Sequence, residues 1–397
     1  MVHPGSSASA AMSPATRADA GCVEVMALQP IAVVDHLGPP VSSDFLRRNL
    51  LAIGGGELGG SERVDPSTLA SLLSKLEAAG ADVSVSTKAG GSAANTARGL
   101  SRGFGVKAGL LGAVGDDEWG SVFVDAMRAA RVDVSNLSEK PGATGRCACF
   151  VEAGSGQRTM RTCLRDAVRL DAREIRTLNS NPLRGASWVL IPGYAFYGDG
   201  LVAAAAAAAA EANCKVALAL ASFEIVRAFG AEIEALMRSG RVSAVFANED
   251  EAREVVALGS RSEEKKANPS NRSRVPATYA SETTADHALD TFARWSPACV
   301  AVVTLGDRGC VAARGDPACE TSERVACEAF EEIVARDSTG AGDLFVSGFM
   351  YGLLRESPLG ECAELGCLAG AAATQSVGAE VSDEGWAWVR DRTPIIQ

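Results

Sequence analysis

The amino-acid sequence predicts an α/β protein, in which a mostly parallel sheet is covered by helices on both faces. Short apolar runs alternate along the chain with amphipathic or alanine-rich stretches of helical spacing, which is typical of this class. Hydrophobic residues make up 47% of the 397 residues, which is ample for a large buried core.

The individual elements follow from these patterns in chain order. Residues 30–35 form an apolar run that ends in Asp35, typical of a buried strand. Residues 65–79 carry leucines at helical spacing after Asp65 and Pro66, a cap and proline that open many helices. Residues 120–130 are also predicted to be helical. Further strands are predicted at 108–114, 146–151, 159–164, 188–191, 216–219, 244–247 and 299–305.

Several segments depart from this alternation. Residues 1–22 are rich in Ser, Ala, Pro and Gly and are predicted to be a disordered tail, with a targeting segment as the alternative. Residues 36–60 and 146–165 are expected to be insertions that form a small accessory sheet. Residues 259–285 are polar and lack periodicity, which predicts a mobile surface loop. The rest of 23–397 is expected to form one domain.

Charge and composition exclude several classes of function. Lys plus Arg is 38 and Asp plus Glu is 49, so the net charge is −11, which disfavours binding to nucleic acid. No run of about 18 apolar residues exists, which argues against a membrane span. Eleven cysteines without a Cys-x-x-Cys pair, and three histidines, favour free thiols over a zinc site. A cytoplasmic location is therefore predicted, with a plastid or other organelle as the alternative.

The strongest candidate site is Asp337-Ser-Thr-Gly-Ala-Gly-Asp343, which precedes an apolar run from Leu344. Small residues at 340–342 allow backbone N–H groups to converge at the start of a helix, where anions bind readily. Asp343 would then face a bound phosphoryl group and could accept a proton from an attacking hydroxyl. A glycine turn before an ordinary capped helix is the alternative.

A second candidate site is Gly90-Gly-Ser-Ala-Ala-Asn95. The two glycines allow the backbone to approach a ligand closely, and Asn95 offers both a hydrogen-bond donor and an acceptor. Many tight helix entries have the same pattern, so this motif alone does not decide between a binding site and a turn.

Together these motifs resemble the PfkB, or ribokinase-like, carbohydrate kinase family, which includes ribokinase, fructokinase and adenosine kinase. Its first signature matches Gly90 to Gly115, and its second matches Asp337 to Phe349, in the family's order. The resemblance implies a ribokinase-like three-layer α/β/α sandwich with a small β lid. It also implies a kinase that moves the γ-phosphate of Mg-ATP to an alcohol.

The resemblance implies roles for residues around the transferring phosphoryl group and the acceptor. It implies that Asp343 is the catalytic base. The implied anion hole is Gly340, Ala341 and Gly342, and the implied acceptor contacts are Asp35, Gly90, Gly91 and Asn95.

For the nucleotide and metals, the resemblance implies a second set of residues. It implies that Glu251 orders Mg²⁺, mostly through water, and that Asp337 is a candidate K⁺ ligand. The implied cofactor-binding residues are Asn248, Glu251, Thr304, Gly306 and Gly309. Without the resemblance, Asn248 and Glu251 are typical of a helix N-terminus with an acidic first turn.

The acceptor is less clearly indicated. Residues 144–161 resemble the accessory-sheet region of adenosine-kinase-like members, which favours a nucleoside, with adenosine as the first candidate. A free-sugar kinase of the ribokinase or fructokinase type is the alternative, and a catalytically silent regulatory relative is a further one. Arg158 is predicted to be solvated, and Arg161 is left between a phosphate contact and a solvated position. Monomer and homodimer both remain open.

Overall fold

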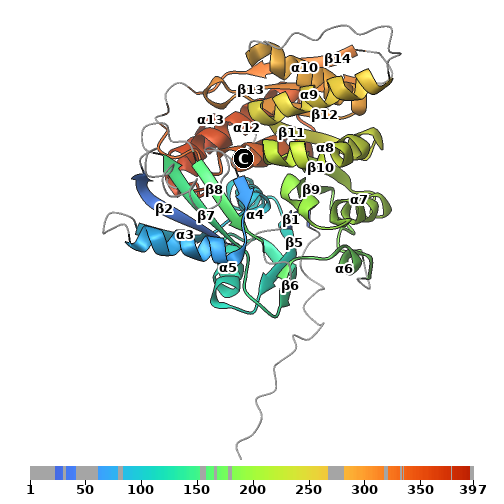
Figure 1. Cartoon of the computed structure of the whole chain (residues 1–397). Coiled ribbons are helices and arrows are strands. Elements are labelled where there is room, and N and C mark those ends of the chain that lie inside the picture. The colour runs from blue at the N-terminus through green and yellow to red at the C-terminus, as the bar shows by residue number, and fades with distance from the viewer. Residues whose placement is uncertain are drawn as a thin grey trace, which may run out of the picture.

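A nine-stranded sheet forms the centre of the chain, described here from a computed structural model (Figure 1). Seven neighbouring strands pair in parallel, and two further strands pair antiparallel at one edge. This confirms the predicted class. The strand order is β14 (Thr321–Cys327), β13 (Cys310–Asp316), β12 (Val300–Thr304), β11 (Val242–Asn248), β10 (Lys215–Ala219), β9 (Trp188–Pro192), β1 (Val25–Gln29), β5 (Ala108–Gly115) and β6 (Asp133–Lys140).

The structure describes residues 23–29, 33–41, 61–78, 84–152, 158–164, 168–177, 181–266, 281–316, 321–330, 333, 335–376 and 378–393. The predicted tail at 1–22 lies outside them, as does the part of the first insertion at 42–60.

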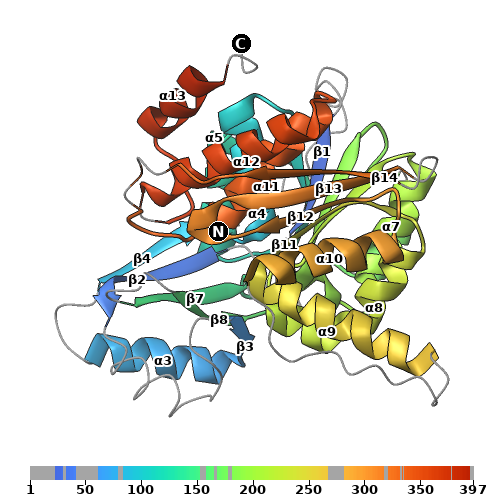
Figure 2. The same ribbon diagram turned by 90° about the horizontal axis from the view of Figure 1, so that it is seen from above.

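Helices cover both faces of this sheet, because successive strand residues point to opposite sides. Ala27 and Leu190 belong to one buried cluster, whereas Leu28 and Val189 belong to the other. Figure 2 shows α11 and α12 on one side of the sheet and α9 and α10 on the other. The first face is covered by α4 (Ser92–Arg98), α5 (Glu118–Ala129), α11 (Ala341–Leu354), α12 (Leu359–Thr374) and α13 (Asp383–Arg392). The second is covered by α6 (Ala172–Thr177), α7 (Leu201–Glu211), α8 (Phe223–Arg238), α9 (Glu249–Lys266) and α10 (Ser281–Trp295).

A second, five-stranded sheet forms the lid. The predicted pairing of the strands near 146–151 and 159–164 is confirmed, because β7 and β8 are antiparallel neighbours. The helix α3 (Pro66–Ala78) begins after Asp65, whose carboxylate accepts the backbone N–H groups of Ser67 and Thr68 at 2.8 and 2.9 Å. The helix α3 lies alongside the lid sheet (Figure 2). The strand order is β3 (Ser61–Arg63), β8 (Arg158–Cys163), β7 (Arg146–Glu152), β2 (Val33–Val41) and β4 (Ser84–Ala89).

The predicted first strand at 30–35 is wrong in its position. The main-sheet strand is β1, which ends at Gln29 before the predicted run, and residues 33–35 belong to β2 in the lid. Asp35 is the third residue of β2, in register with Thr87 of β4 and Ala148 of β7, and not the end of a main-sheet strand. Its side chain lies outside what the structure describes.

The predicted loop at 259–285 is also wrong at both ends. The helix α9 continues to Lys266, and α10 begins at Ser281. Residues 263–266 are two glutamates and two lysines, which are polar but form helices readily. The apolar residues Ala285, Ala288 and Leu289 bury one face of α10. Residues 267–280 lie outside the described residues.

Candidate active site

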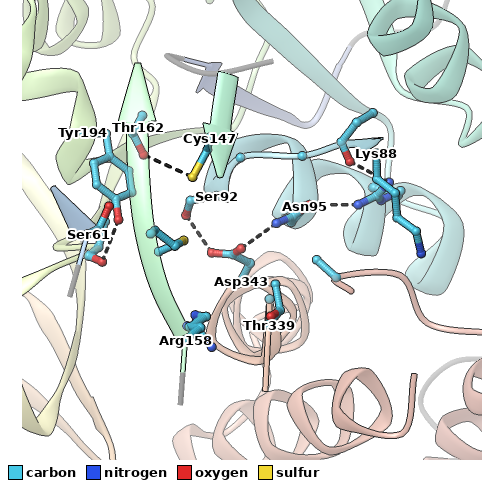
Figure 3. A pocket seen from close by; sticks show the side chains of 18 of the residues that line it. Ser61, Lys88, Ser92, Asn95, Cys147, Arg158, Thr162, Tyr194, Thr339 and Asp343 are labelled. Atoms are coloured by element: carbon cyan, nitrogen blue, oxygen red, sulfur yellow. Dashed lines mark hydrogen bonds between the residues drawn. The ribbon is translucent and has the colours of Figure 1, made fainter. Parts of the chain in front are cut away.

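A pocket lies between the lid and the starts of α4 and α11, near the carboxyl ends of the parallel strands (Figure 3). Ligands commonly bind at this edge of an open α/β sheet. The structure brings five predicted site residues together in its wall, although they come from segments about 250 residues apart in the chain. These are Gly90, Gly91, Asn95, Gly340 and Asp343.

Asp343 is at the centre of the pocket, in the first turn of α11. Its two carboxylate oxygens accept hydrogen bonds from α4: Ser92 Oγ donates to Oδ1 at 2.7 Å, and Asn95 Nδ2 donates to Oδ2 at 2.8 Å. The hydroxyls of Thr96 and Ser347 donate to its backbone oxygen at 3.1 and 3.0 Å. The carboxylate is therefore held in one orientation at the junction of the two signature motifs.

The electrostatic surroundings of Asp343 act in opposite directions. Burial raises the pKa of its carboxyl group above the usual value. The hydrogen bonds from Asn95 and Ser92 lower this pKa, as do the positive charges of Arg158 and Arg98. The result is a fixed carboxylate that binds a proton more readily than an exposed aspartate.

The turn before α11 depends on glycine at one position. Gly340 has a φ of 76°, and a Cβ placed on it would lie 2.2 Å from Cβ of Ala379. At Gly342, by contrast, a Cβ would have no heavy atom within 4 Å. The first N–H groups of a helix have no partner within the helix, so the start of α11 offers donors to an anion. Gly342 contributes one of these groups, whereas the N–H of Ala341 donates to the Ser338 carbonyl oxygen at 3.2 Å.

Gly91, at the start of α4, also has a backbone conformation that favours glycine. It is the N-cap residue of that helix, with a φ of 98° that a residue with a side chain rarely adopts. Asn95 donates its backbone N–H to the Gly91 carbonyl at 2.9 Å. The geometry places Ser92 and Asn95 on the same side of α4, facing Asp343.

Asn248 and Glu251 form a reciprocal cap at the start of α9. Asn248 N and Nδ2 donate to the Glu251 carboxylate at 2.9 and 2.8 Å, and Glu251 N donates to Asn248 Oδ1 at 2.9 Å. This is the helix-start arrangement that the residues alone suggested. Glu251 is 3% exposed, and burial raises the pKa of its carboxyl group to about 8.

The structure places the remaining nucleotide candidates beside this cap. Thr304 is in register with Asn248 at the ends of β12 and β11, and neither residue lines the pocket around Asp343. Gly306 has a φ of 64°, and a Cβ on Gly309 would lie 1.9 Å from the carbonyl oxygen of Cys327. Arg158 connects the two groups, because its charge acts on both Glu251 and Asp343.

The Asp337 carboxylate accepts hydrogen bonds both from the turn before α11 and from the chain after α12. Its Oδ1 accepts the backbone N–H of Thr339 at 2.8 Å, and its Oδ2 accepts that of Gly378 at 2.8 Å. The side chain is buried. This is a structural contact that the sequence pattern did not predict.

The prediction that Arg158 is solvated is wrong. Its Nη1 donates to the carbonyl oxygen of Ser338 at 2.6 Å and lies 3.2 Å from Ser338 Oγ. Alternation explains this contact, because Arg158, Met160 and Thr162 all line the pocket from β8. Arg161 points to the other face, where it is 1% exposed and its Nε lies 3.5 Å from a Glu62 carboxylate oxygen. It is therefore neither solvated nor a pocket residue.

Other pocket residues were missed by sequence reasoning. Ser92 and Arg98 lie one helical turn before and after Asn95, so helical spacing could have indicated them. Tyr194 follows β9 and lines the pocket opposite α4, and burial raises the pKa of its hydroxyl strongly. No local pattern marks Tyr194, since only the tertiary fold brings it to the site.

Comparisons with known proteins agree with this architecture. A model of the pfkB family carbohydrate kinases matches residues 70–385. The structure of adenosine kinase from Sinorhizobium meliloti is similar, with a TM-score of 0.75 and 26% identity over 94% of this chain and 99% of that one. A probable sugar kinase from Rhizobium etli gives a TM-score of 0.72 and 25% identity, over 93% and 98% of the two chains. Adenosine kinase from Schistosoma mansoni, at 18% identity and a TM-score of 0.72 over 94% and 100%, shares the fold. A comparison with curated protein sequences gives no match.

The protein is therefore an enzyme, a phosphotransferase of ribokinase-like fold. The chain belongs to the pfkB family of carbohydrate kinases, whose members are ATP-dependent and act on small molecules. Within the described residues, no helix is both long and apolar enough to cross a membrane.

Proposed function

We propose that this enzyme is a nucleoside kinase, which transfers the γ-phosphate of Mg-ATP to the primary hydroxyl of a ribose-containing nucleoside. Adenosine is the first acceptor to test. The observation that carries the proposal is the character of the pocket wall away from Asp343.

That wall is largely apolar and includes an aromatic ring. Tyr194, Met160 and Cys147 line it together with Ser61 and Thr162, which carry hydroxyls. Figure 3 shows Tyr194, Ser61, Thr162 and Cys147 on this side of the pocket. A flat apolar base with a few polar edge atoms matches such a wall, as ligand pockets are mostly apolar with a small number of polar groups. A free sugar presents hydroxyls on every side and would leave more of them without partners on this wall.

In the proposed mechanism, Asp343 accepts the proton of the attacking hydroxyl as its oxygen bonds to the γ-phosphorus. The bond between that phosphorus and the β–γ bridging oxygen breaks, and ADP leaves. Gly340, Ala341 and Gly342 present backbone N–H groups to the transferring phosphoryl group, whose negative charge the start of α11 stabilises. Arg158 approaches the same turn from the lid and adds positive charge. Positioning and charge neutralisation then supply most of the acceleration.

Acceptor hydroxyls are proposed to bind to Asp35, Gly90, Gly91 and Asn95. Three of these residues line the pocket with Asp343, which supports this assignment. Asp35 lies on β2 of the lid, so the lid carries part of the acceptor site.

ATP and Mg²⁺ fit the residues beyond the start of α11. We assign the nucleotide side to Asn248, Glu251, Thr304, Gly306 and Gly309, with Asp337 as a candidate K⁺ ligand. The Glu251 carboxylate fits an ordered Mg²⁺ shell, because each of its oxygens accepts one hydrogen bond from Asn248 and retains a further lone pair. Bound Mg²⁺ would supply charge neutralisation on the phosphates.

The proposal is tested by an ADP-release assay with Mg-ATP and K⁺ against nucleosides and free sugars. Strong turnover with one nucleoside, and little with ribose or fructose, is expected. Turnover only with a free sugar would move the enzyme to the ribokinase or fructokinase type. No turnover with any acceptor, while ATP still raises the thermal midpoint, would overturn the proposal in favour of a silent relative.

A further inference from the structure

A buried guanidinium lies behind the residues that hold Asp343. Arg98 is the last residue of α4, one turn after Asn95, and its side chain is 8% exposed. Burial of a charged group is costly unless other groups pair with it in good geometry. The position of Arg98 therefore depends on the contacts that its two terminal nitrogens make.

Those contacts connect three separate segments. Arg98 Nη2 donates to Asn95 Oδ1 at 2.8 Å. Its Nη1 donates to Glu380 Oε1 at 2.7 Å and lies 3.5 Å from the carbonyl oxygen of Ala89. Glu380 follows α12 and also lines the pocket. The fork of the guanidinium therefore spans from Glu380 to the Asn95 side chain, which in turn binds Asp343.

The contact with Asn95 fixes which way its amide faces. An asparagine amide has nearly the same shape in both orientations, so its partners decide between them. Arg98 can only donate, so it requires Oδ1 on its side, and Nδ2 then points to Asp343. In the opposite orientation Oδ1 would face the carboxylate, and the amide nitrogen would face the guanidinium. Both contacts would be repulsive.

The charge of Arg98 also reaches Asp343. The charged or titratable groups that line the pocket around this carboxylate are Arg98 from α4, Arg158 from β8, Tyr194 from the turn after β9, Lys88 from β4, Cys147 from β7 and Glu380 after α12. The two arginines lower the pKa of Asp343, in opposition to burial. Loss of Arg98 would therefore leave a carboxyl group that is protonated at higher pH.

We propose that Arg98 is a positioning residue for phosphoryl transfer, which holds the Asn95 amide so that the Asp343 carboxylate faces the acceptor hydroxyl. Glu380 anchors the guanidinium from the other side. The role in the reaction rests on the proposed function, whereas the coupling between Arg98 and Asp343 stands without any acceptor.

The first test compares R98M with R98K, and with R102M as the matched control. Arg102 is one turn further along the same surface, half-exposed and paired with Asp383 at 2.8 Å. R98M is expected to lower kcat about 10- to 100-fold, as small misplacements of catalytic groups do. The acid limb of its pH profile should move up by about one pH unit, since a nearby opposite charge shifts a pKa by about that much or more.

R98K should restore most of the acid limb, because it keeps the charge, but only part of kcat, because an ammonium lacks the planar fork. R102M should match the wild type both in kcat and in the position of the acid limb. An R98M enzyme with wild-type kcat and an unmoved acid limb would overturn the proposal.

The second test needs no substrate. The thermal midpoints of wild type, R98M, D343N and R98M/D343N form a double-mutant cycle. R98M should lower the midpoint more in the wild-type background than in D343N, because Arg98 stabilises the ionised carboxylate. Additive effects would overturn the proposal. If R98M does not fold, R98Q replaces it in both tests, with shifts expected in the same directions, because it also removes the positive charge but keeps a polar side chain.

The two tests separate this proposal from the proposed function. Coupling in the cycle without turnover on any nucleoside would contradict the nucleoside kinase alone. Turnover on a nucleoside, with an additive cycle and an unmoved acid limb, would contradict the role of Arg98 alone.

Discussion

The Asp343 carboxylate combines two properties that a general base needs, a fixed position and a pKa raised towards neutral pH. Its position comes from Ser92 and Asn95, and burial raises the pKa. D343N keeps the shape but cannot accept a proton, so kcat should fall about 10²- to 10⁴-fold. ATP should still raise the thermal midpoint of D343N as it does for the wild type. Near-normal turnover with the best acceptor would contradict the assignment.

A pH dependence follows from the same carboxyl group. Because its pKa lies above the usual value, the base becomes protonated as pH falls through that raised pKa. We expect kcat/KM for the acceptor to fall on the acid side, with a limb above the usual aspartate value. A profile of kcat/KM against pH checks this, with acceptor and nucleotide titrated separately. A flat acid side down to pH 4 would contradict it.

Glu251 makes the stability of the enzyme depend on pH. Its pKa is raised to about 8, so the native state holds a proton that the unfolded state loses near pH 4.5. The stabilising effect of this proton is complete below about pH 4.5 and is lost as pH rises to about 8. Relative to E251Q, the wild-type thermal midpoint without Mg²⁺ should therefore fall across this range. E249Q, a substitution in the same helical turn, serves as the control. A constant difference between wild type and E251Q would contradict the prediction.

The two glycines at the start of α11 differ in whether the fold tolerates a side chain. Gly340 has a positive φ, and a Cβ there would collide with Ala379, so G340A should be destabilised by about 1–3 kcal/mol. Gly342 has open space around it, so G342A should fold normally. Its backbone N–H is one of the proposed donors to the phosphoryl group, so a methyl group beside it should lower kcat. Urea denaturation and steady-state kinetics measure the two effects, and equal loss of stability in both variants would contradict this distinction.

Hydrogen bonds from the edge strand β3 connect the lid to residues that cover the nine-stranded sheet. Ser61 N donates to a Glu224 carboxylate oxygen of α8 at 3.2 Å, and the Ser61 side chain bonds to the Tyr194 hydroxyl. Loss of one such bond costs about 0.5–1.5 kcal/mol. E224A should therefore raise the KM for the acceptor roughly 2- to 10-fold and increase ATP hydrolysis without acceptor, since lid closure excludes water. E232A, an exposed position on the same helix, should change neither quantity. Unchanged KM and hydrolysis in E224A would rule out this role for the edge strand.

Across the whole molecule, the sequence predicted those features that depend on local patterns of residues. Apolar runs located most of the parallel strands, and the two glycine-rich motifs indicated the residues that meet at Asp343. It did not predict that the main-sheet strand β1 ends at Gln29 and that residues 33–35 belong to the lid strand β2, because both segments are largely apolar. Arg158 and Tyr194 were missed for a different reason. Their partners lie far away in the chain, and only the packed fold brings them to the pocket.

The contact between α4 and α11 has a consequence for synthesis of the chain. Asn95 and Arg98 leave the ribosome long before Asp343 and Glu380, the carboxylates that they bind in the finished enzyme. Until the segment with α11 and Glu380 emerges, the polar groups of α4 have only water or temporary neighbours in place of these partners. The residues before α11 can collapse but cannot complete this site. A nonsense mutation between β14 and residue 343 should therefore yield a chain without the proposed base and with an exposed apolar sheet face, which is prone to aggregation.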